Sequence, residues 1–152
     1  MTNPRSCPVD VVVMAAGKGT RMKSALPKVL HALAGKPMVQ HVIDTAQRLQ
    51  ARHTIVITGH GAEQVEQALL DANTPGLKFA RQMPQLGTGH AVQQAVPALA
   101  DDGVVVVLSG DVPLTRTETL QALLGVCADQ QLALLTIELD DPTGYGLSLI
   151  HI

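Results

Sequence analysis

The sequence predicts an α/β fold, in which helices cover both faces of a mostly parallel sheet. Short apolar runs alternate five times with segments of helical periodicity, which is the order that parallel strands joined by crossover helices require. Two of the runs, residues 9–14 and 104–108, are almost continuously β-branched. Such runs are typical of strands that are covered on both faces.

The first half of the chain supplies two strands and two helices. Residues 9–14 form the first expected strand. A Leu-Ala-Gly-Lys turn at residues 33–36 precedes a proline, and proline is favoured at the first position of a helix, here expected over residues 37–50. Residues 54–58 form the next strand, and a Gly-His-Gly turn leads from it into a helix over residues 62–70.

The second half continues the alternation. A short strand is expected at residues 77–80, and a Gly-Thr-Gly sequence then opens a helix over residues 90–99. Residues 104–108, four valines and a leucine, predict the central strand of the sheet. A capping box formed by Thr115 and Glu118 starts a helix that extends to residue 128, and residues 132–139 form the last strand.

Composition narrows the functional classes. The 152 residues suit one domain, and aromatic side chains are limited to Phe79 and Tyr145. With a net charge of −2, this composition disfavours nucleic acid as a partner. No segment is suited to inserting into a membrane or to directing export, and the two cysteines, Cys7 and Cys127, indicate reduced thiols. We therefore expect a cytoplasmic protein.

Positive charge is concentrated in the segment that follows the first strand. No acidic residue lies between Asp10 and Asp44, whereas that interval holds five of the eleven lysines and arginines. These are Lys18, Arg21, Lys23, Lys28 and Lys36. Fixed cations beside a glycine-rich turn favour phosphate oxygens. The expected ligand is a polyphosphate.

Two common phosphate motifs fit this segment poorly. Met22 stands where a Walker A loop needs its second glycine after Gly17, so a P-loop NTPase is excluded. Gly17 and Gly19 supply only the first two glycines of the dinucleotide fingerprint, and no acidic residue has the spacing that would hold a ribose. An NAD site is therefore disfavoured.

Four motifs together carry a more specific resemblance. They are MAAGKGTRMKSALPKVLHALAGKPMVQHVID, QLGTGHAVQQA, SGDVPL and DDPTGYG. In this order, over residues 9–146, the chain resembles the uridyltransferase domain of bifunctional N-acetylglucosamine-1-phosphate uridyltransferase/glucosamine-1-phosphate acetyltransferases. The resemblance implies a Rossmann-like, three-layer nucleotidyltransferase fold.

The resemblance also implies a reaction. UMP would pass from UTP to N-acetylglucosamine 1-phosphate with Mg²⁺, giving pyrophosphate and UDP-N-acetylglucosamine for the peptidoglycan and lipopolysaccharide of the cell envelope. Arg21 and Lys28 would be catalytic, and Asp111 would bind the metal. The other substrate-binding positions that match the family are Met14, Ala15, Ala16, Gly17, Gln82, Gly87, Thr88, Ser109, Gly110 and Gly146. Among these, Gln82, Gly87 and Thr88 would contact uracil.

Simpler interpretations remain for several residues. Lys23 and Lys36 are expected to be solvated surface charges, the six histidines to be structural or exposed, and Asp111 could instead form an Asx-turn. Two alternative functions also stay open. One is transfer of a different nucleotide or to a different acceptor, and the other is nucleotide binding without turnover.

The end of the sequence departs from the family pattern. After Gly146 the chain has Leu-Ser-Leu-Ile-His-Ile, where the family continues with an arginine and a further strand. We therefore expect residues 1–152 to be a partial uridyltransferase domain that is incomplete at its C-terminus. The second magnesium ligand, the rest of the sugar site and the acetyltransferase β-helix would be missing. The full-length members of the family form a homotrimer, and the oligomeric state of residues 1–152 stays open.

Overall fold

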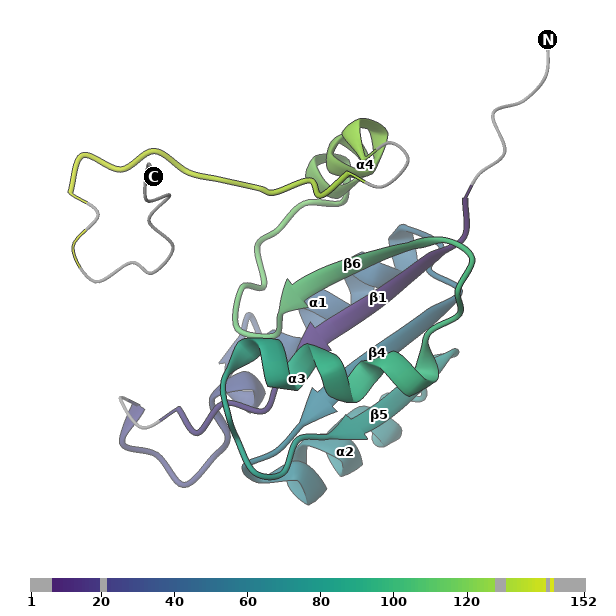
Figure 1. The fold of residues 1–152 in the computed structure, drawn as a ribbon. Coiled ribbons are helices and arrows are strands. Elements are labelled where there is room, and N and C mark those ends of the chain that lie inside the picture. The colour runs from purple at the N-terminus through teal and green to yellow at the C-terminus, as the bar shows by residue number, and fades with distance from the viewer. Residues whose placement is uncertain (1–6, 20–21, 128–130, 142, 144–152) are drawn as a thin grey trace, which may run out of the picture.

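A parallel sheet of four strands forms the centre of the molecule in the computed structural model (Figure 1). The structure describes residues 7–19, 22–127, 131–141 and 143. The strands are β1 (Val9–Met14), β4 (His53–Thr58), β5 (Leu77–Arg81) and β6 (Val104–Ser109). Their order across the sheet is β5-β4-β1-β6, and all three neighbouring pairs are parallel. The expected α/β fold with a mostly parallel sheet is thus confirmed.

Helices cover both faces of this sheet. The helices are α1 (Met38–Arg48), α2 (Ala62–Asp71), α3 (Thr88–Ala95) and α4 (Thr117–Val126). In Figure 1, α3 crosses in front of the strands, whereas α1 and α2 lie behind them. Short 3-10 turns occur at η2 (Lys28–Leu30) and η3 (Val96–Ala98). None of the helices in the described ranges is long and apolar enough to span a membrane.

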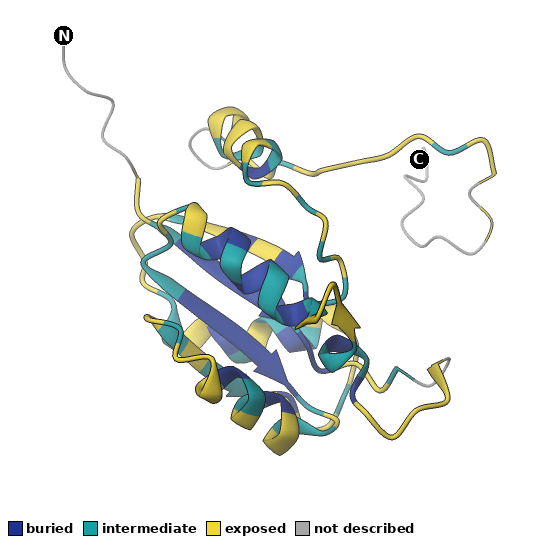
Figure 2. Cartoon of the chain, turned by 180° about the vertical axis from the view of Figure 1, so that it is seen from behind, coloured by how far each residue is buried: buried dark blue, intermediate teal, exposed yellow. Residues whose placement is uncertain are grey.

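Strand β1 contributes to two separate hydrophobic layers, because its successive side chains point to opposite faces. Val11 and Val13 pack in the layer that contains Ile43 of α1 and Leu69 of α2. Val12 packs in the other layer, to which α3 contributes the small side chains of Ala91 and Ala95. Figure 2 shows the buried residues concentrated along the strands and on the helix sides that face them. Burial on both faces explains the unbroken apolar run.

The expected turn at residues 33–36 is a tight hairpin. It joins β2 (Ala32–Leu33) to β3 (Lys36–Pro37), and its two central residues, Ala34 and Gly35, have φ values of 51° and 79°. Positive φ at both positions is the geometry of the two-residue hairpin turn. The proline that follows is the N-cap of α1 rather than its first residue, so the helix begins one position later than the sequence predicted.

Strand β6 lies at an edge of the described sheet, so the prediction that it is central is wrong. Val106 and Leu108 face the core, but Val105 and Val107 are 40% and 44% exposed on the opposite face. Residue type alone does not reveal which strands will flank a β-branched run. An apolar run of five residues is compatible with an edge strand that has one covered face.

Two predictions for the C-terminal part are also wrong. Residues 132–139 contain no strand, and Leu132 and Ile137 are 85% and 76% exposed. No partner strand pairs with this segment within the described ranges, and a strand exists only through such pairing. The expected capping box is absent too, because α4 has Arg116 at its N-cap with no side-chain cap, while the Thr115 hydroxyl donates to the Val112 carbonyl at 3.3 Å.

The helix expected over residues 90–99 is divided into two elements. It begins earlier, at Thr88, and its α-helical part ends at Ala95, after which η3 forms a single 3-10 turn. Pro97 lies in that turn, and proline lacks the N–H that an α-helix needs. The first turn of α3 therefore starts directly at the Gly-Thr-Gly sequence, which brings it next to the candidate site.

Candidate functional site

A cavity of about 640 Å³ opens at the carboxyl ends of the parallel strands. Ligands of parallel α/β sheets characteristically bind beyond this edge. The cavity is lined by these expected residues: Met14, Ala15, Ala16, Gly17, Lys28, Gln82, Gly87, Thr88, Ser109 and Asp111. Gly110 adjoins the cavity but is not part of its lining. Arg21 and Gly146 lie outside the described residues.

The loop after β1 is held against both neighbouring strands. The Ala15 N–H donates to the Ile57 carbonyl at 2.8 Å, and the Gly110 N–H donates to the Met14 carbonyl at 2.9 Å. Ala15 and Ala16 are only 3% and 6% exposed. Small buried side chains thus let the floor of the cavity consist largely of backbone.

A glycine brings the basic segment back to this floor. Gly19 has a φ of +58°, and a Cβ at this position would lie 2.8 Å from the Cβ of Lys28. A larger residue would therefore be strained by its backbone conformation and would also displace Lys28. Pro27 then leads into η2, where Lys28 is the first residue. The close approach at Gly19 helps to place the lysine beside the cavity.

Lys28 and Asp111 form an ion pair within the cavity. The Lys28 Nζ lies 2.6 Å from the Asp111 Oδ2, and the two side chains are 41% and 33% exposed. Among the described residues, the carboxylate of Asp111 has its one hydrogen bond with Lys28, so nothing supports the Asx-turn interpretation. A cation and a carboxylate that are 83 residues apart in the sequence are therefore available to the same ligand.

The donor set of the cavity suits a magnesium ion that is also held by phosphate. No cluster of three or more His, Cys, Asp or Glu side chains occurs in the part of the chain that the structure describes. Mg²⁺ does not require one, since it commonly uses one or two carboxylates together with substrate phosphates and water. Asp111, partly exposed in the cavity, can supply such a carboxylate.

The opposite wall of the cavity is formed around Gln82. This residue is 3% exposed, and its backbone N–H donates to the Thr58 carbonyl at 2.8 Å. Its side-chain Nε2 donates to the Gly87 carbonyl at 2.8 Å and lies 3.2 Å from the His90 Nδ1. Gly87 has a φ of +101°, a conformation that favours glycine. The amide of Gln82 is thus enclosed by the start of α3.

Sequence reasoning missed Gln85, which lines the cavity, and it expected His90 to be structural or exposed, whereas the structure places His90 beside Gln82. The Gln85 Nε2 donates to the Ala16 carbonyl at 2.6 Å, which ties the loop after β5 to the loop after β1. Gly59 makes room for this contact, since a Cβ there would lie 2.7 Å from the Gln85 amide nitrogen. Gln85 and His90 are the first and last residues of the QLGTGH motif. Their contacts, however, depend on how separate loops meet.

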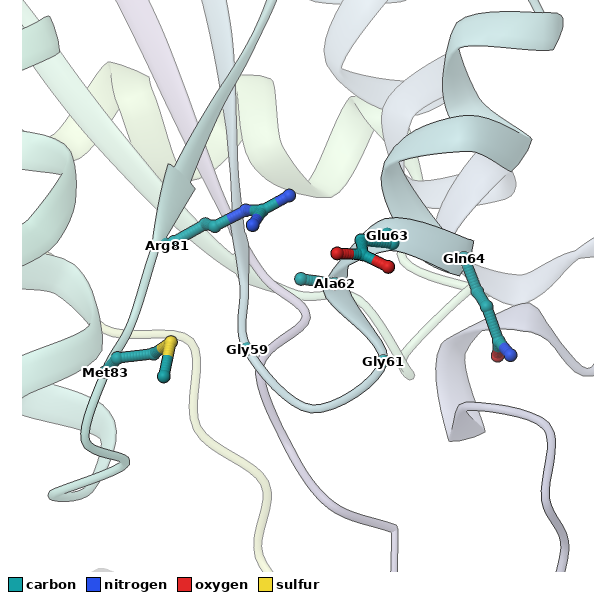
Figure 3. A pocket seen from close by; sticks show the side chains of 7 residues that line it. All are labelled: Gly59, Gly61, Ala62, Glu63, Gln64, Arg81 and Met83. Atoms are coloured by element: carbon teal, nitrogen blue, oxygen red, sulfur yellow. The ribbon is translucent and has the colours of Figure 1, made fainter.

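A smaller hollow of about 330 Å³ lies at the N-terminus of α2 (Figure 3). Its arginine, Arg81, is already engaged, because its Nη2 lies 2.8 Å from the Glu66 Oε2 and its Nε donates to the Glu66 Oε1 at 3.0 Å. These hydrogen bonds hold the pKa of Glu66 below its ordinary value. None of the expected site residues lines this hollow, so the larger cavity is the candidate site.

Comparison with known proteins shows which sequences and folds this chain resembles. The model of the MobA-like NTP transferase domain family matches residues 11–146. The bifunctional protein GlmU of Polaromonas sp. (strain JS666) is 65% identical over 91% of this chain, and that of Cellvibrio japonicus is 57% identical over the same share. The chain spans about 31% and 30% of the lengths of these two relatives.

Solved structures agree with the fold. A nucleotidyl transferase from Methanothermobacter superposes with a TM-score of 0.70 at 25% identity. The superposition covers 78% of this chain and 57% of the transferase chain. A UDP-glucose pyrophosphorylase from Acinetobacter superposes with a TM-score of 0.59 at 21% identity, over 68% of this chain and 46% of its own. At that identity the second likeness supports the fold alone.

Proposed function

Because this chain belongs to the family of MobA-like NTP transferase domains, we propose that it is the nucleotide-binding part of a uridyltransferase. The reaction transfers UMP from UTP to N-acetylglucosamine 1-phosphate and yields UDP-N-acetylglucosamine and pyrophosphate. One observation carries the proposal: the Lys28–Asp111 pair lies in the same cavity as Gln82. The high identity to proteins named GlmU supports this choice of substrates.

The chemistry demands cations rather than a nucleophilic side chain. A phosphate oxygen of the sugar phosphate attacks the α-phosphorus of UTP, and the bond to the leaving pyrophosphate breaks. Both partners are anionic, so positioning and charge stabilisation supply most of the catalysis. Lys28 neutralises charge near the reacting phosphorus. Arg21, which lies outside the described residues, is proposed to hold the leaving phosphates.

We assign Mg²⁺ binding to Asp111. When bound, the ion neutralises phosphate charge and orients the phosphate oxygens. The carboxylate at present pairs with the Lys28 ammonium at 2.6 Å. If Mg²⁺ and a polyphosphate bind together, Asp111 exchanges the lysine for the metal ion and Lys28 exchanges the carboxylate for a phosphate. The ion pair therefore keeps both groups positioned before the substrate binds.

The uracil and phosphate contacts complete the proposed site. Gln82, Gly87 and Thr88 contact the base, and the backbone from Met14 to Gly17 contacts the nucleotide. Ser109 and Gly110, together with Gly146 beyond the described residues, belong to the same substrate site. We propose that the whole protein works in the cytoplasm on peptidoglycan and lipopolysaccharide precursors and forms a homotrimer.

Calorimetric titration of the purified chain with UTP, CTP and ATP tests this proposal. We expect Mg²⁺-dependent binding of UTP, with clear preference over CTP and ATP. The expected preference rests on the proposed contacts of Gln82, Gly87 and Thr88 with the edge of uracil. Equal binding of all three nucleotides would remove the uridyl assignment.

A further inference from the structure

The amide of Gln82 is held on two sides by the first turn of α3. We propose that His90 is a positioning residue, which fixes the orientation of this amide and thereby makes the cavity selective for uracil over cytosine. The inference rests on the proposed binding of UTP in this cavity. His90 itself does not need to touch the nucleotide.

The carbonyl of Gly87 identifies the two ends of the Gln82 amide. A carbonyl oxygen can only accept a hydrogen bond, so the amide atom 2.8 Å from it must be the nitrogen. The same nitrogen lies 3.2 Å from the His90 Nδ1. An amide nitrogen carries two hydrogens and no acceptor site. Both hydrogens are therefore used, and only the oxygen of Gln82 remains for a ligand.

The proposal requires one tautomer of His90. Nδ1 accepts from Gln82 and must be bare, so in the neutral ring Nε2 carries the proton. The amide of Gln94, whose Nε2 is placed 3.2 Å from the His90 Nε2, then meets an N–H group. The same Nε2 donates to the His90 carbonyl at 3.1 Å, so the nitrogen of Gln94 also faces the ring, and the proposal requires that the single acceptor of the neutral ring serves Gln82 rather than Gln94. If Nδ1 carried the proton instead, the N–H of His90 would face the NH₂ group of Gln82, and neither group could accept a hydrogen bond from the other.

The surroundings leave the Gln82 side chain little freedom. It is 3% exposed, and the residue's backbone is bonded to the Thr58 carbonyl at 2.8 Å. Gly87 is the N-cap of α3 and His90 lies in the first turn of the same helix. Both partners of the amide therefore move as one unit. Turning the amide over would break the bond to Gly87 and lose the contact with His90.

A fixed acceptor distinguishes the two pyrimidines. Uracil carries a hydrogen at N3, whereas N3 of cytosine is a bare acceptor. The oxygen of Gln82 can accept a hydrogen bond from the N3–H of uracil. At cytosine the same oxygen would face another acceptor, the bare N3, and the two would repel each other. A rotated amide would present its NH₂ group and suit cytosine equally well. Selectivity then depends on the group that prevents rotation, and the Gly87 carbonyl and the His90 Nδ1 share that task.

Titration of two His90 variants with UTP and CTP in the presence of Mg²⁺ tests the assignment. The unsubstituted chain should prefer UTP. His90→Leu removes the acceptor, and we expect the ratio of UTP to CTP affinity to fall by about tenfold, the loss appropriate to one oriented hydrogen bond. His90→Asn keeps an acceptor oxygen near the place of Nδ1 and should retain the ratio.

The outcomes separate this inference from the proposed function. If the unsubstituted chain binds neither nucleotide, the proposed function fails and the inference fails with it. If the chain prefers UTP but His90→Leu keeps the full preference, only the role of His90 is overturned. The nitrogen NMR signals of His90 in the unsubstituted chain give a check that needs no variant. A bare Nδ1 supports the assignment, and a protonated Nδ1 contradicts it.

Discussion

At the scale of single residues, the ion pair between Lys28 and Asp111 determines how the cavity presents charge. The two groups lie 2.6 Å apart and are both partly exposed. Each is therefore close to water, and exposed ion pairs contribute little to stability. Their separation in the sequence and their shared position in the cavity indicate a role in binding.

Replacing Lys28 should weaken nucleotide binding without unfolding the chain. In Lys28→Met the loss of one charge-assisted contact to phosphate should lower UTP affinity by about tenfold or more, as measured by calorimetry with Mg²⁺. Lys36→Met is the matched control. Lys36 also forms a 2.6 Å pair, with Asp44, but it does not line the cavity. An equal loss in both variants would contradict a specific role for Lys28.

Replacing Asp111 should uncouple nucleotide binding from the metal. In Asp111→Asn the side chain keeps its size but loses the charge that favours a hard cation. We expect UTP affinity in excess Mg²⁺ to fall toward the value found without the ion, because the metal no longer links carboxylate and phosphate. Titrations with and without Mg²⁺ measure this difference. A variant that retains the full metal dependence would place the magnesium ligand elsewhere.

The sequence could predict some of these residues because their motifs are local. The glycine loop and Lys28 belong to one continuous segment, and Asp111 lies two residues after a strand whose sequence range was predicted almost correctly. Gln85 and His90 differ, since their importance comes from contacts between separate parts of the fold. A glutamine or a histidine in a loop carries no sign of its partner. Their roles could be inferred only once the carbonyl of Ala16 and the amide of Gln82 had positions.

At the scale of elements, glycine at Gly61 joins the start of α2 to the basic segment. Gly61 is the N-cap of α2 and has a φ of +66°. A Cβ at this position would lie 2.7 Å from the Cγ of Pro27. The residue next in sequence to Pro27 is Lys28. A close fit between helix and loop therefore supports the cavity from outside.

Adding one methyl group at Gly61 should therefore destabilise the fold. Gly61→Ala is expected to lower the free energy of unfolding by at least about 1–2 kcal/mol, because alanine disfavours positive φ and the new methyl meets Pro27. Urea titration followed by circular dichroism measures it. Gly125→Ala in α4 is the control, since nothing lies within 4 Å of its added Cβ and a helical alanine gains about 0.5–1 kcal/mol. Equal losses would refute the argument from fit.

Element prediction succeeded where burial and periodicity agreed. The apolar run of β1 is covered on both sides, as its composition suggested. The run at residues 132–139 has similar composition but no partner strand in the described structure, and it is exposed. The pairing of strands is a property of the assembled sheet. Composition could indicate that both segments favour extended backbone, but it could not supply a neighbour for the second.

At the scale of the whole molecule, the end of the sheet opposite the cavity is held by a charged cluster. Asp10, at the start of β1, is 2% exposed and receives two hydrogen bonds from Arg52, at 2.7 and 3.1 Å. Arg52 also donates to the Asp102 carboxylate at 2.8 Å, and the His53 Nδ1 lies 3.3 Å from Asp10. The cluster therefore links the starts of three of the four strands: Asp10 lies in β1, His53 begins β4 and Asp102 precedes β6.

This cluster should make stability depend on acid. The hydrogen bonds from Arg52 hold the pKa of Asp10 below its ordinary value of 3.8. As the pH falls, the carboxylate of Asp10 is therefore protonated in the unfolded chain before it is protonated in the folded one. What Asp10 contributes to the free energy of unfolding is complete above about pH 4 and is lost as the pH drops through the lowered pKa. We expect Asp10→Asn to reduce the free energy of unfolding near neutral pH by about 1.5–3 kcal/mol.

Urea titrations between about pH 6 and pH 2 measure this contribution. The difference between the unsubstituted chain and Asp10→Asn should shrink as the pH falls below about 4, because the carboxyl group is then neutral in both states of the chain. A difference that stays constant over the whole range would show that the effect of the substitution is not electrostatic.

The charged cluster and the cavity lie at opposite ends of β1, so the length of this strand separates them. Asp10 and Met14 are four residues apart on one strand, and only Met14 lines the cavity. At about 3.3 Å per residue they are separated by roughly 13 Å. Substitutions this far apart with no shared partner usually act additively, to within about 0.5 kcal/mol. Lys28 lines the same cavity as Met14, so a double-mutant cycle between Asp10→Asn and Lys28→Met should show almost no coupling in unfolding free energy. The acid sensitivity of the fold can then be altered without changing what the cavity lysine contributes to stability.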